Sequence, residues 1–432
     1  MLAFRVKKTA VILSGVRVRK SNISDYRSFN RELGQRVIDL AEGLRGRRVV
    51  HINATPKGGG VAEMLKGQVA LERDLGLDSR WLVLGDLPLE FFETTKKIHN
   101  LLQGKGGALT EDEKSTYLKA NKEIAGELKT YLRKHKTDVL VVHDPQPLAA
   151  IGKLKLEIPS LLRLHIDLST PNAAAFRFFE EFVILYDLVA LSRRDYKPPW
   201  LPAQKLRISY PAIDPLAEKN KIISKTKAQS VLRKLSIDTS RPVATQVSRF
   251  DPWKDPIGVV EAYRRAKKSV PELQLALAGF MEAQDDPEAV RVIDQVRKEV
   301  GSDPDVFLFS DLGVLKGTSH ALFINALQRA SDVVLQKSIR EGFGLTVTEA
   351  MWKYSPVVGG RTEGIEIQID HGKSGFLVDS PQEAAEYMVK LISNPSLRRR
   401  MGKAAHESVE EKFLIVRLIE DYLKTYRELL EF

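Results

Sequence analysis

Two glutamates in the segment REGFGLTVTEAM are the side chains most suggestive of chemistry in this 432-residue sequence. Glu341 lies in a loop with two glycines, and Glu349 stands eight positions later, in a helix predicted to begin near Leu345. Since a helix rises 1.5 Å per residue, the carboxylates are up to about 12 Å apart, whereas a retaining glycosidase holds its pair roughly 5.5 Å apart. We therefore expect two subsites, with Glu341 at a sugar and Glu349 at a ribose. The alternative for Glu349 is an ordinary acid on a helix surface.

Two cations follow a predicted buried strand in the segment VSRFDPWKDP. Arg249 comes soon after the strand predicted at Val243–Val247, and Lys254 stands five residues later at the start of the next predicted helix. Open α/β sheets bind ligands at the carboxyl ends of their parallel strands. Two cations at that edge could neutralise a leaving diphosphate without a metal. Taken singly, each cation could instead form a surface salt bridge.

Three consecutive glycines, Gly58, Gly59 and Gly60, lie between a predicted strand that ends at Asn53 and a predicted helix that opens with Val61. Glycine lets the backbone approach a ligand closely, and the amides at a helix N-terminus favour negative charge. The loop therefore suits a diphosphate. It matches neither a Walker loop nor GxGxxG, and a tight turn without a ligand is the alternative.

Histidines and acids end two further predicted strands, in the segments VVHDPQP and LRLHIDLS. His143 and Asp144 follow the first strand, and His165 and Asp167 follow the second. At neighbouring strand ends these side chains could hold sugar hydroxyls across a cleft. They could instead bind a metal or be hydrogen-bonded core residues. Because neither HxxxH nor another clustered spacing is present, no metal site is expected.

The elements that must position these residues alternate between short apolar runs and amphipathic helices, a pattern typical of parallel sheets with crossover helices. Helices are predicted at Asn30–Leu44 and Lys114–His135. The predicted strands are Arg48–Asn53, Arg80–Leu84, Asp138–His143, Leu161–His165, Asp187–Leu191 and Leu206–Ser209 in the first half, and Val243–Val247, Leu273–Ala278, Val306–Phe309, Val333–Gln336, Val357–Val358 and Phe376–Val378 in the second. Each half is thus expected to be a doubly wound α/β unit.

The segment SYPAIDPLAEKN marks the predicted boundary between two domains, because prolines and lysines replace the strand pattern there. The predicted domains are residues 1–213, with an N-terminal extension over 1–45, and residues 214–409. A last helix over residues 410–432 carries an apolar stripe and is expected to cross back to the first domain. The extension is expected to serve packing or self-association, as in a homodimer.

The charge and composition of the chain exclude several classes of protein. Lys and Arg outnumber Asp and Glu by 67 to 56, a net charge of +11 that attracts phosphorylated substrates from a distance. The basic residues are spread among acids, so nucleic acid is not an expected partner. No apolar run approaches the roughly 20 residues that cross a membrane, and there are no cysteines for disulfides or thiolate chemistry. A cytoplasmic protein without a membrane partner is expected.

The quoted segments resemble a known family. EGFGLTVTEA is similar to the motif of family 4 retaining glycosyltransferases in which seven residues separate two glutamates, and Arg249 and Lys254 match the cations that hold the donor diphosphate there. The segments NATPKGGGVAEML, HDPQP and HIDLS more narrowly resemble the trehalose glycosyltransferring synthases of hyperthermophilic archaea and bacteria, which are near relatives of trehalose phosphorylases. The resemblance runs from about Arg48 to the C-terminus. It implies a glycosyltransferase-B (GT-B) fold, in which two Rossmann-like domains face each other across a cleft.

The resemblance also implies roles for the matching residues. Glu341 and His165 would lie at the glucosyl unit, and Asp144 and Gln146 are expected at the acceptor. The residues expected at the diphosphate and ribose of the donor are Gly58, Gly59, Gly60, Arg249, Lys254, Gly342, Phe343, Gly344, Leu345, Thr346 and Glu349. Two positions depart from the family pattern: Glu363 stands where a glycine doublet is usual, and Asp255 follows Lys254 where glycine is common.

The implied reaction moves an α-glucosyl unit from NDP-glucose, with UDP- or ADP-glucose as donor, to glucose. It retains the anomeric configuration, forms trehalose and is reversible. No cofactor is required, although Mg²⁺ could stimulate the reaction. A trehalose phosphorylase or another family 4 sugar transferase is the alternative, and a non-catalytic binder of sugar nucleotides or nucleic acid is a more distant one.

Overall fold

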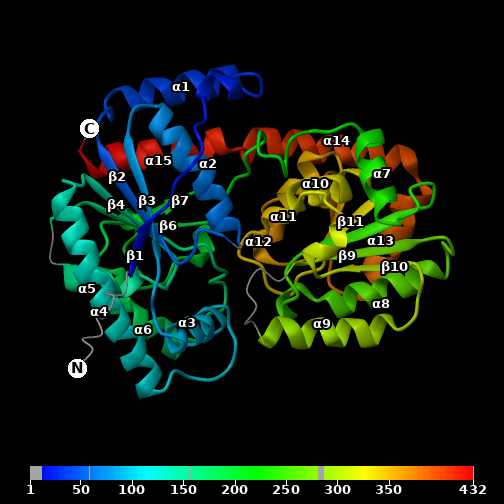
Figure 1. The fold of residues 1–432 in the computed structure, drawn as a ribbon, viewed down its shortest axis with the longest axis horizontal. Coiled ribbons are helices and arrows are strands. Elements are labelled where there is room, and N and C mark those ends of the chain that lie inside the picture. The colour runs from blue at the N-terminus through cyan, green and yellow to red at the C-terminus, as the bar shows by residue number, and fades with distance from the viewer. Residues whose placement is uncertain (1–11, 58, 155–156, 281–286, 432) are drawn as a thin grey trace, which may run out of the picture. The chain divides into compact units, whose positions relative to one another are not determined.

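The chain forms two compact units in a computed structural model (Figure 1). The first unit contains Met1–Ser209 and Leu418–Phe432, and the second contains Tyr210–Arg417. The first boundary therefore falls after Ser209, while the predicted boundary lies after Ile213. The residues that the structure describes are 12–57, 59–154, 157–280 and 287–431.

The first unit is built on a sheet that, over the described residues, contains seven strands in the order β1-β3-β2-β4-β5-β6-β7. Neighbouring strands are parallel except for β1 with β3, which are antiparallel. The strands are β1 (Leu13–Gly15), β2 (Arg48–Asn53), β3 (Asp78–Leu84), β4 (Val139–His143), β5 (Ser160–Arg163), β6 (Leu188–Leu191) and β7 (Leu206–Ile208). The parallel core of this sheet is that of a Rossmann-like unit.

Helices cover both faces of the first sheet (Figure 1). Val50, Leu140 and Leu162 on one face pack with α3, α4 and α6, while Trp81 and Val83 on the other pack with α2. Strands that are buried on both faces read as nearly continuous apolar runs, which is why the sequence reveals them. The helices of this unit are α1 (Arg31–Glu42), α2 (Gly60–Asp74), α3 (Leu89–Leu102), α4 (Glu111–Lys134), α5 (Ile151–Leu154), α6 (Ala173–Val183) and, from Leu418, α15 (Ile415–Leu429).

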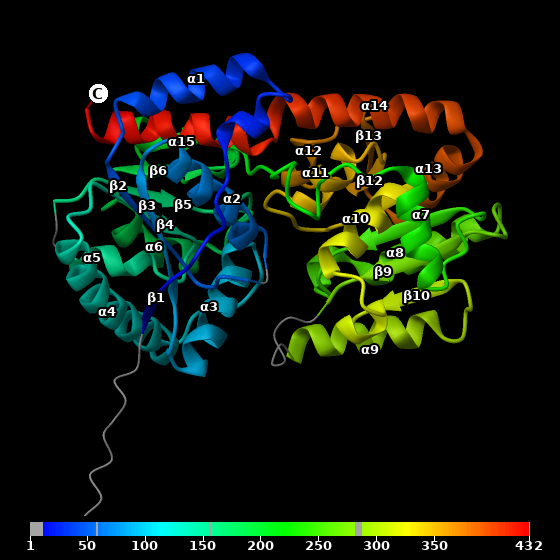
Figure 2. The same ribbon diagram turned by 45° about the horizontal axis from the view of Figure 1, so that its top comes forward.

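The described part of the N-terminal extension, from residue 12 onward, packs onto its own unit. Strand β1, which the sequence does not predict, pairs antiparallel with the edge strand β3, and the backbone amide of Leu13 donates to the Glu127 carboxylate of α4 at 3.0 Å. Helix α1 lies beside α15 in both views (Figure 2), and Arg36 and Glu420 form an ion pair between them at 2.9 Å. A strand of three residues is too short to give a detectable alternation of apolar and polar side chains, which is why the sequence pattern does not reveal β1.

The second unit contains a parallel sheet whose described strands number six, in the order β10-β9-β8-β11-β12-β13. Helices α8, α9, α13 and α14 pack on one face of this sheet, and α7 and α10 on the other. The strands are β8 (Val243–Val247), β9 (Gln274–Ala278), β10 (Val306–Phe309), β11 (Val333–Gln336), β12 (Val357–Gly360) and β13 (Gly375–Val378). The helices are α7 (Lys225–Lys234), α8 (Pro256–Lys267), α9 (Pro287–Val300), α10 (His320–Ala330), α11 (Leu345–Trp352), α12 (Glu363–Glu366), α13 (Pro381–Ser393) and α14 (Pro395–Lys412).

All twelve predicted strands are present among the described residues, with ends that differ by at most two residues. The last helix differs more. The prediction of one helix from Glu410 is wrong, because α14 ends at Lys412 and α15 begins at Ile415. Between them Leu414 forms a parallel bridge with Ile213, which interrupts the helical hydrogen bonds.

None of the helices in the described ranges is both long enough and apolar enough to cross a membrane.

Candidate active site

The carboxyl ends of β8 and β11, neighbouring strands of the second sheet, bring a lysine, a glutamate and a serine together. Lys254 ends the short 3-10 helix η5 (Pro252–Lys254), and its Nζ lies 2.5 Å from Oε2 of Glu341 in the loop after β11. Ser338 Oγ donates to the same oxygen at 3.2 Å. Glu341 is only 8% exposed, so the pair is a mostly buried one in which each charge needs the other. The structure thus joins Lys254 and Glu341 at the ligand-binding edge of an open α/β sheet.

Arg249 follows the same strand but is placed differently. Its side chain is 60% exposed, and its guanidinium lies 3.3 Å from Asp251 Oδ2. The other oxygen of Asp251 accepts a hydrogen bond from the backbone amide of Trp253 at 2.9 Å, which fixes the turn into η5. Arg249 therefore forms its ion pair with Asp251, and the structure does not bring it into contact with Glu341.

Asp255, at the first departure from the family pattern, connects η5 to α8. It has a φ of +46°, in the left-handed region that aspartate tolerates better than most residues. Its Oδ1 accepts a hydrogen bond from the Gly258 amide at 3.0 Å and so caps α8, and its Oδ2 pairs with Lys337 after β11. The aspartate thus makes the turn that glycine would make and adds a cap. Sequence reasoning missed Lys337, because its partner lies in a distant segment.

Close backbone contacts hold the loop that carries Glu341. Gly344 has a φ of +84°, which glycine adopts without strain. A Cβ on Gly364 would lie 2.3 Å from the carbonyl oxygen of Glu341, so a larger residue would displace the loop. Gln368 donates hydrogen bonds to carbonyl groups of both segments. At the second departure from the family pattern, Glu363 begins α12, and the adjacent Gly364 makes the close approach.

The amides predicted to face phosphate and ribose lie at the start of α11. Gly342 and Phe343 are buried, while Gly344, Leu345 and Thr346 are half-buried. The N-cap residue Gly344 supplies no side-chain acceptor to the first turn of the helix. An uncapped helix N-terminus favours a bound anion.

Glu349 is buried within α11, so it is not an acid on a helix surface. Its Oε1 pairs with Lys219 Nζ at 2.9 Å. Its Oε2 is buried and has no hydrogen-bond partner among the described residues. A buried carboxylate oxygen is costly without a donor, so this atom fits a ligand hydroxyl. Sequence reasoning missed Lys219, because a lysine in a lysine-rich linker gives no signal of its distant partner.

In the first unit, the predicted glycine loop leads into α2. Gly59 is the N-cap residue and offers no side-chain cap, and helix α2 begins at Gly60. A Cβ on Gly59 would meet nothing within 4 Å, so the space beside this exposed glycine is open. Gly58 lies outside the described residues. The first turn of α2 therefore also suits an anion.

Three histidines form a hydrogen-bonded row on the face of the first sheet that α2 and α15 cover. His51 Nδ1 lies 3.1 Å from His143 Nε2, and His143 Nδ1 lies 3.1 Å from His165 Nε2. Burial, with smaller effects of Arg163 and, for His143, the neighbouring histidines, holds the pKa of His143 and of His165 well below the usual value, so both rings are neutral. The predicted residues His143 and His165 are thus brought together, and sequence reasoning missed His51. The histidines in VVHIN, VVHDP and LRLHID are the signal that could have revealed it.

The other predicted residues of the first unit lie at the same strand ends. Asp144 Oδ1 accepts a hydrogen bond from the His165 amide at 2.8 Å, and burial raises the pKa of Asp144 to about 6. Asp167 is buried and accepts from the Ser169 amide at 2.8 Å. Oε1 of Gln146 is buried without a hydrogen-bond partner in the described part of the chain. Asp144 therefore joins the ends of β4 and β5, and Gln146 has an acceptor atom left for a ligand.

The described residues include no group of three or more His, Cys, Asp or Glu side chains placed to hold a metal ion.

Comparisons with known proteins identify the class of enzyme. The model of the trehalose synthase N-terminal domain matches residues 51–198, and that of the glycosyl transferases group 1 matches residues 228–408. A structure of α,α-trehalose 6-phosphate synthase from Burkholderia multivorans has a TM-score of 0.70, with 15% identity over 89% of this chain and 99% of that one. A structure of Alr3699/HepE from Anabaena in complex with UDP-glucose has a TM-score of 0.65, with 17% identity over 89% and 99%. The two sheets are those of a GT-B glycosyltransferase.

Full-length relatives identify the family. The trehalose synthase of Pyrococcus horikoshii is 43% identical over 94% of this chain and 95% of its own length. The trehalose synthase of Rubrobacter xylanophilus is also 43% identical, over 94% of this chain and 97% of its own length. This chain belongs to the trehalose synthase family and is a glycosyltransferase.

Proposed function

We propose that the chain transfers an α-glucosyl unit from NDP-glucose to free glucose with retention, forms trehalose, and runs in both directions. The observation that carries this proposal is the cluster of Lys254, Ser338 and Glu341 beside the uncapped start of α11. A half-buried lysine paired with the loop that leads to an uncapped helix start suits a diphosphate, and the carboxylate 2.5 Å from that lysine is proposed to lie at the sugar.

The second unit is proposed to bind the donor. The diphosphate takes the amides of Leu345 and Thr346 and the ammonium of Lys254, and Arg249, on its exposed side chain, closes on it from solvent. The ribose hydroxyls donate to Oε2 of Glu349, the buried atom without a partner among the described residues. Two of the supporting features are the uncapped helix start and this oxygen, since both are groups that a protein rarely leaves unsatisfied.

The first unit is proposed to supply His165 at the glucosyl group and Gly59 and Gly60 at the diphosphate, with Gln146 at the acceptor sugar. The open space beside Gly59 supports a close approach of a ligand to the backbone. The buried Oε1 of Gln146 supports a hydroxyl contact.

The proposed reaction is a front-side displacement. The bond from the anomeric carbon to the phosphate oxygen breaks, the acceptor oxygen bonds to the same face, and the acceptor proton passes to the leaving phosphate oxygen. The protein then contributes orientation and neutralisation of the diphosphate charge rather than a covalent nucleophile. No resident cofactor is needed, and a comparison of rates with Mg²⁺ and with a chelator checks this part of the proposal.

The experiment that tests the function incubates the protein with UDP-, ADP- or GDP-glucose and free glucose. The expected products are the nucleoside diphosphate and a non-reducing disaccharide, and Glu341→Ala is expected to abolish both. Trehalose with inorganic phosphate and no nucleotide is the parallel assay, and release of glucose 1-phosphate there without nucleotide-dependent transfer would establish a phosphorylase instead. The buried oxygen of Glu349 favours the nucleotide-dependent reaction, because a ribose ligand has no purpose in a phosphorylase.

A further inference from the structure

A buried carboxylate lies at the inner end of the histidine row. Glu72 of α2 is fully buried, and its Oε2 lies 3.0 Å from Nε2 of His51. The row then continues through His143 to His165, which is half-buried and so is the end nearest solvent. Four side chains, from β2, β4, the segment that follows β5 and helix α2, thus form one continuous hydrogen-bonded chain.

The sheet register explains why the histidines line up. His51 of β2 is paired with Val141 of β4, two positions before His143, and His143 is paired with Arg163 of β5, two positions before His165. Since side chains alternate between faces with a period of two, all three histidines point to the same face. Each lies two positions closer to the carboxyl edge than the one before it. The row therefore climbs diagonally from the core to the ligand-binding edge of the sheet.

The surroundings of Glu72 fix the direction of the hydrogen bonds at its end. Besides His51, three neutral groups donate to its two oxygens: Ser79 Oγ at 2.6 Å, Tyr426 Oη at 2.9 Å and Gln68 Nε2 at 3.0 Å. An ionised carboxylate only accepts, and it has room for about four hydrogen bonds. Burial alone would raise the pKa of Glu72, but His51, Ser79 and Gln68 lower it, so the carboxylate stays charged. His51 therefore donates through Nε2.

In a neutral imidazole one nitrogen carries the proton and the other accepts, so a donor at one end of the row sets every ring after it. With Nε2 of His51 donating to Glu72, its Nδ1 accepts from Nε2 of His143, and Nδ1 of His143 accepts from Nε2 of His165. We propose that Glu72, acting through His51 and His143, holds His165 in the tautomer whose Nδ1 is unprotonated, so that His165 receives a hydroxyl of the sugar substrate as a hydrogen-bond acceptor. Glu72, His51 and His143 are positioning residues, and the sugar contact rests on the proposed function.

If the hydrogen bonds of the row ran in the opposite direction, Nδ1 of His165 would be a donor instead of an acceptor. An imidazolium at His51 would donate to His143, His143 would donate to His165, and Nδ1 of His165 would then carry a proton. That nitrogen would suit an oxygen without a proton, such as a phosphate, instead of a hydroxyl. The buried guanidinium of Arg163 lies on the same face and disfavours added positive charge on His143 and His165. His143 and His165 are therefore neutral in either sense of the row, and the sense is decided at His51, which the NMR experiment tests.

Nitrogen NMR of the intact protein labelled with ¹⁵N-histidine tests the tautomer without any substrate. The chain has eight histidines, and His165→Gln identifies the signals of His165 by their loss. The expected result is a protonated Nε2 and an unprotonated Nδ1 on a neutral ring. A protonated Nδ1 in the wild type overturns the proposal.

Variants test whether Glu72 sets the tautomer. Glu72→Gln allows the new amide to donate to His51, so the reversed tautomer is expected to appear at His165, and kcat/KM for transfer is expected to fall about tenfold. Ser79→Ala and Tyr426→Phe each remove one hydrogen bond from the same carboxylate but keep its charge, and are expected to leave the tautomer unchanged. An unchanged tautomer in Glu72→Gln overturns the role of Glu72.

His143→Gln gives a second test that does not depend on how well Glu72→Gln folds. Breaking the row in its middle is expected to leave a mixture of tautomers at His165, and a single unchanged tautomer there contradicts the proposal. The arms also separate this inference from the proposed function. If the wild type transfers glucose from none of the three nucleotide sugars, the proposed function fails while the NMR result still decides the tautomer. If the wild type is active but Glu72→Gln and Ser79→Ala have the same kcat/KM, the positioning role fails alone.

Discussion

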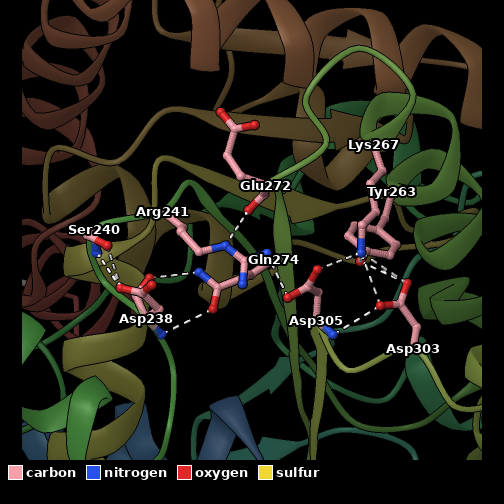
Figure 3. A network of polar contacts seen from close by, with 9 residues as sticks. All are labelled: Asp238, Ser240, Arg241, Tyr263, Lys267, Glu272, Gln274, Asp303 and Asp305. Atoms are coloured by element: carbon pink, nitrogen blue, oxygen red, sulfur yellow. Dashed lines mark hydrogen bonds and ion pairs between the residues drawn. The ribbon is translucent and has the colours of Figure 1, made fainter.

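The two ends of the second sheet carry charged clusters that differ in how fully their charges are paired. At the amino ends of β9 and β10 (Figure 3), Lys267 Nζ lies 2.8 Å from Asp305, 3.1 Å from Asp303 and 2.7 Å from Tyr263 Oη. Arg241 forms a second ion pair with Asp305 at 2.6 Å. Burial opposes ionisation, yet the hydrogen bonds with Lys267 lower the pKa of both aspartates and raise that of Lys267. We call these five residues the amino-end cluster.

The carboxyl ends of β8 and β11 carry a second charged cluster, which is less fully paired. Lys254 has one carboxylate, Glu341, and the nearby Glu349 uses one oxygen for Lys219 and keeps the other buried without a partner among the described residues. The charged groups of the amino-end cluster pair with one another. Such pairing suits a cluster whose role is to hold strands together. At the carboxyl end, Oε2 of Glu349 has no donor among the described residues and is available to a ligand.

The helices also differ in whether a side chain caps the amides of their first turn. Within the described residues, eight helices begin with a side chain that accepts from the first turn, at Asn30, Thr110, Asn172, Ser224, Asp255, Ser319, Ser380 and Asn394. Helices α2, α3, α11 and α12 begin without such a cap, and of these α2 and α11 have a glycine, Gly59 and Gly344, at that position. A side-chain cap stabilises a helix by roughly 1 kcal/mol, so a glycine in its place makes sense where a ligand anion takes over the amides.

Removing Lys254 should show the largest effect, a loss of activity that is specific to the carboxyl-end cluster. Lys254→Ala is expected to weaken transition-state stabilisation by about 2 to 4 kcal/mol, which lowers kcat/KM roughly 30- to 1000-fold, because the leaving diphosphate loses its half-buried cation. Steady-state kinetics with NDP-glucose and glucose measures this. The matched control is Lys403→Ala, which removes an exposed lysine paired with Glu407 and should leave kcat/KM unchanged. Near-normal turnover after neutral substitution of both Arg249 and Lys254 would refute the role of the cations.

Removing Lys267 should instead lower the stability of the protein and leave its activity nearly unchanged. Lys267→Met leaves Asp303 and Asp305 close together without their shared cation, so the free energy of unfolding is expected to fall by about 2 kcal/mol. Urea denaturation measures the loss, and kcat/KM is expected to stay within about twofold of the wild type. A variant of full stability but low activity would mean that the amino-end cluster serves the reaction, and the comparison between the two ends would break.

The strands and the glycine-bearing loops could be predicted from the sequence because each leaves a local signal. Parallel strands buried on both faces read as apolar runs, and Gly59 and Gly344 stand where helices would otherwise have a capping side chain. The seven-residue spacing of Glu341 and Glu349 is likewise contained within one segment, so the sequence alone was enough to single out both acids, and their assignment to two subsites stays a prediction.

What the sequence could not reveal depends on the tertiary fold. Lys219 meets Glu349, Lys337 meets Asp255 and Glu72 meets His51 through strand order and helix packing. No spacing along the chain encodes such pairs, because register and crossover connections bring them together. The same reason explains why the sequence does not predict the break before α15: it comes from a bridge between Leu414 and the distant Ile213.

Glu349 offers a finer test of the incomplete cluster. Glu349→Gln is expected to raise KM for NDP-glucose about tenfold with little change in kcat, because hydrogen bonds to a charged acceptor are stronger than those to a neutral amide and the ribose lies away from the bond that breaks. Kinetics at varied donor concentration, with inhibition by the free nucleoside diphosphate, measures the effect. Glu407→Gln is the matched control, since it removes an exposed glutamate that also has a lysine partner. Equal KM values for the two variants would show that Glu349 does not bind the ribose.

The smallest expected effect is a change in the free energy of unfolding at low pH. Asp303 and Asp305 have folded-state pKa values below the roughly 3.9 of unfolded aspartate, so their contribution to stability is present above about pH 4 and is lost as the pH falls through the folded-state values. The difference in unfolding free energy between wild type and Lys267→Met should therefore be constant near neutral pH and shrink to less than about half below pH 3. Urea denaturation of both proteins across that range measures it, and Lys403→Met should differ little from wild type at any pH. A difference that stays constant below pH 3 would show that Lys267 stabilises by packing its stem rather than by its charge, and the amino-end cluster would lose its contrast with the carboxyl end.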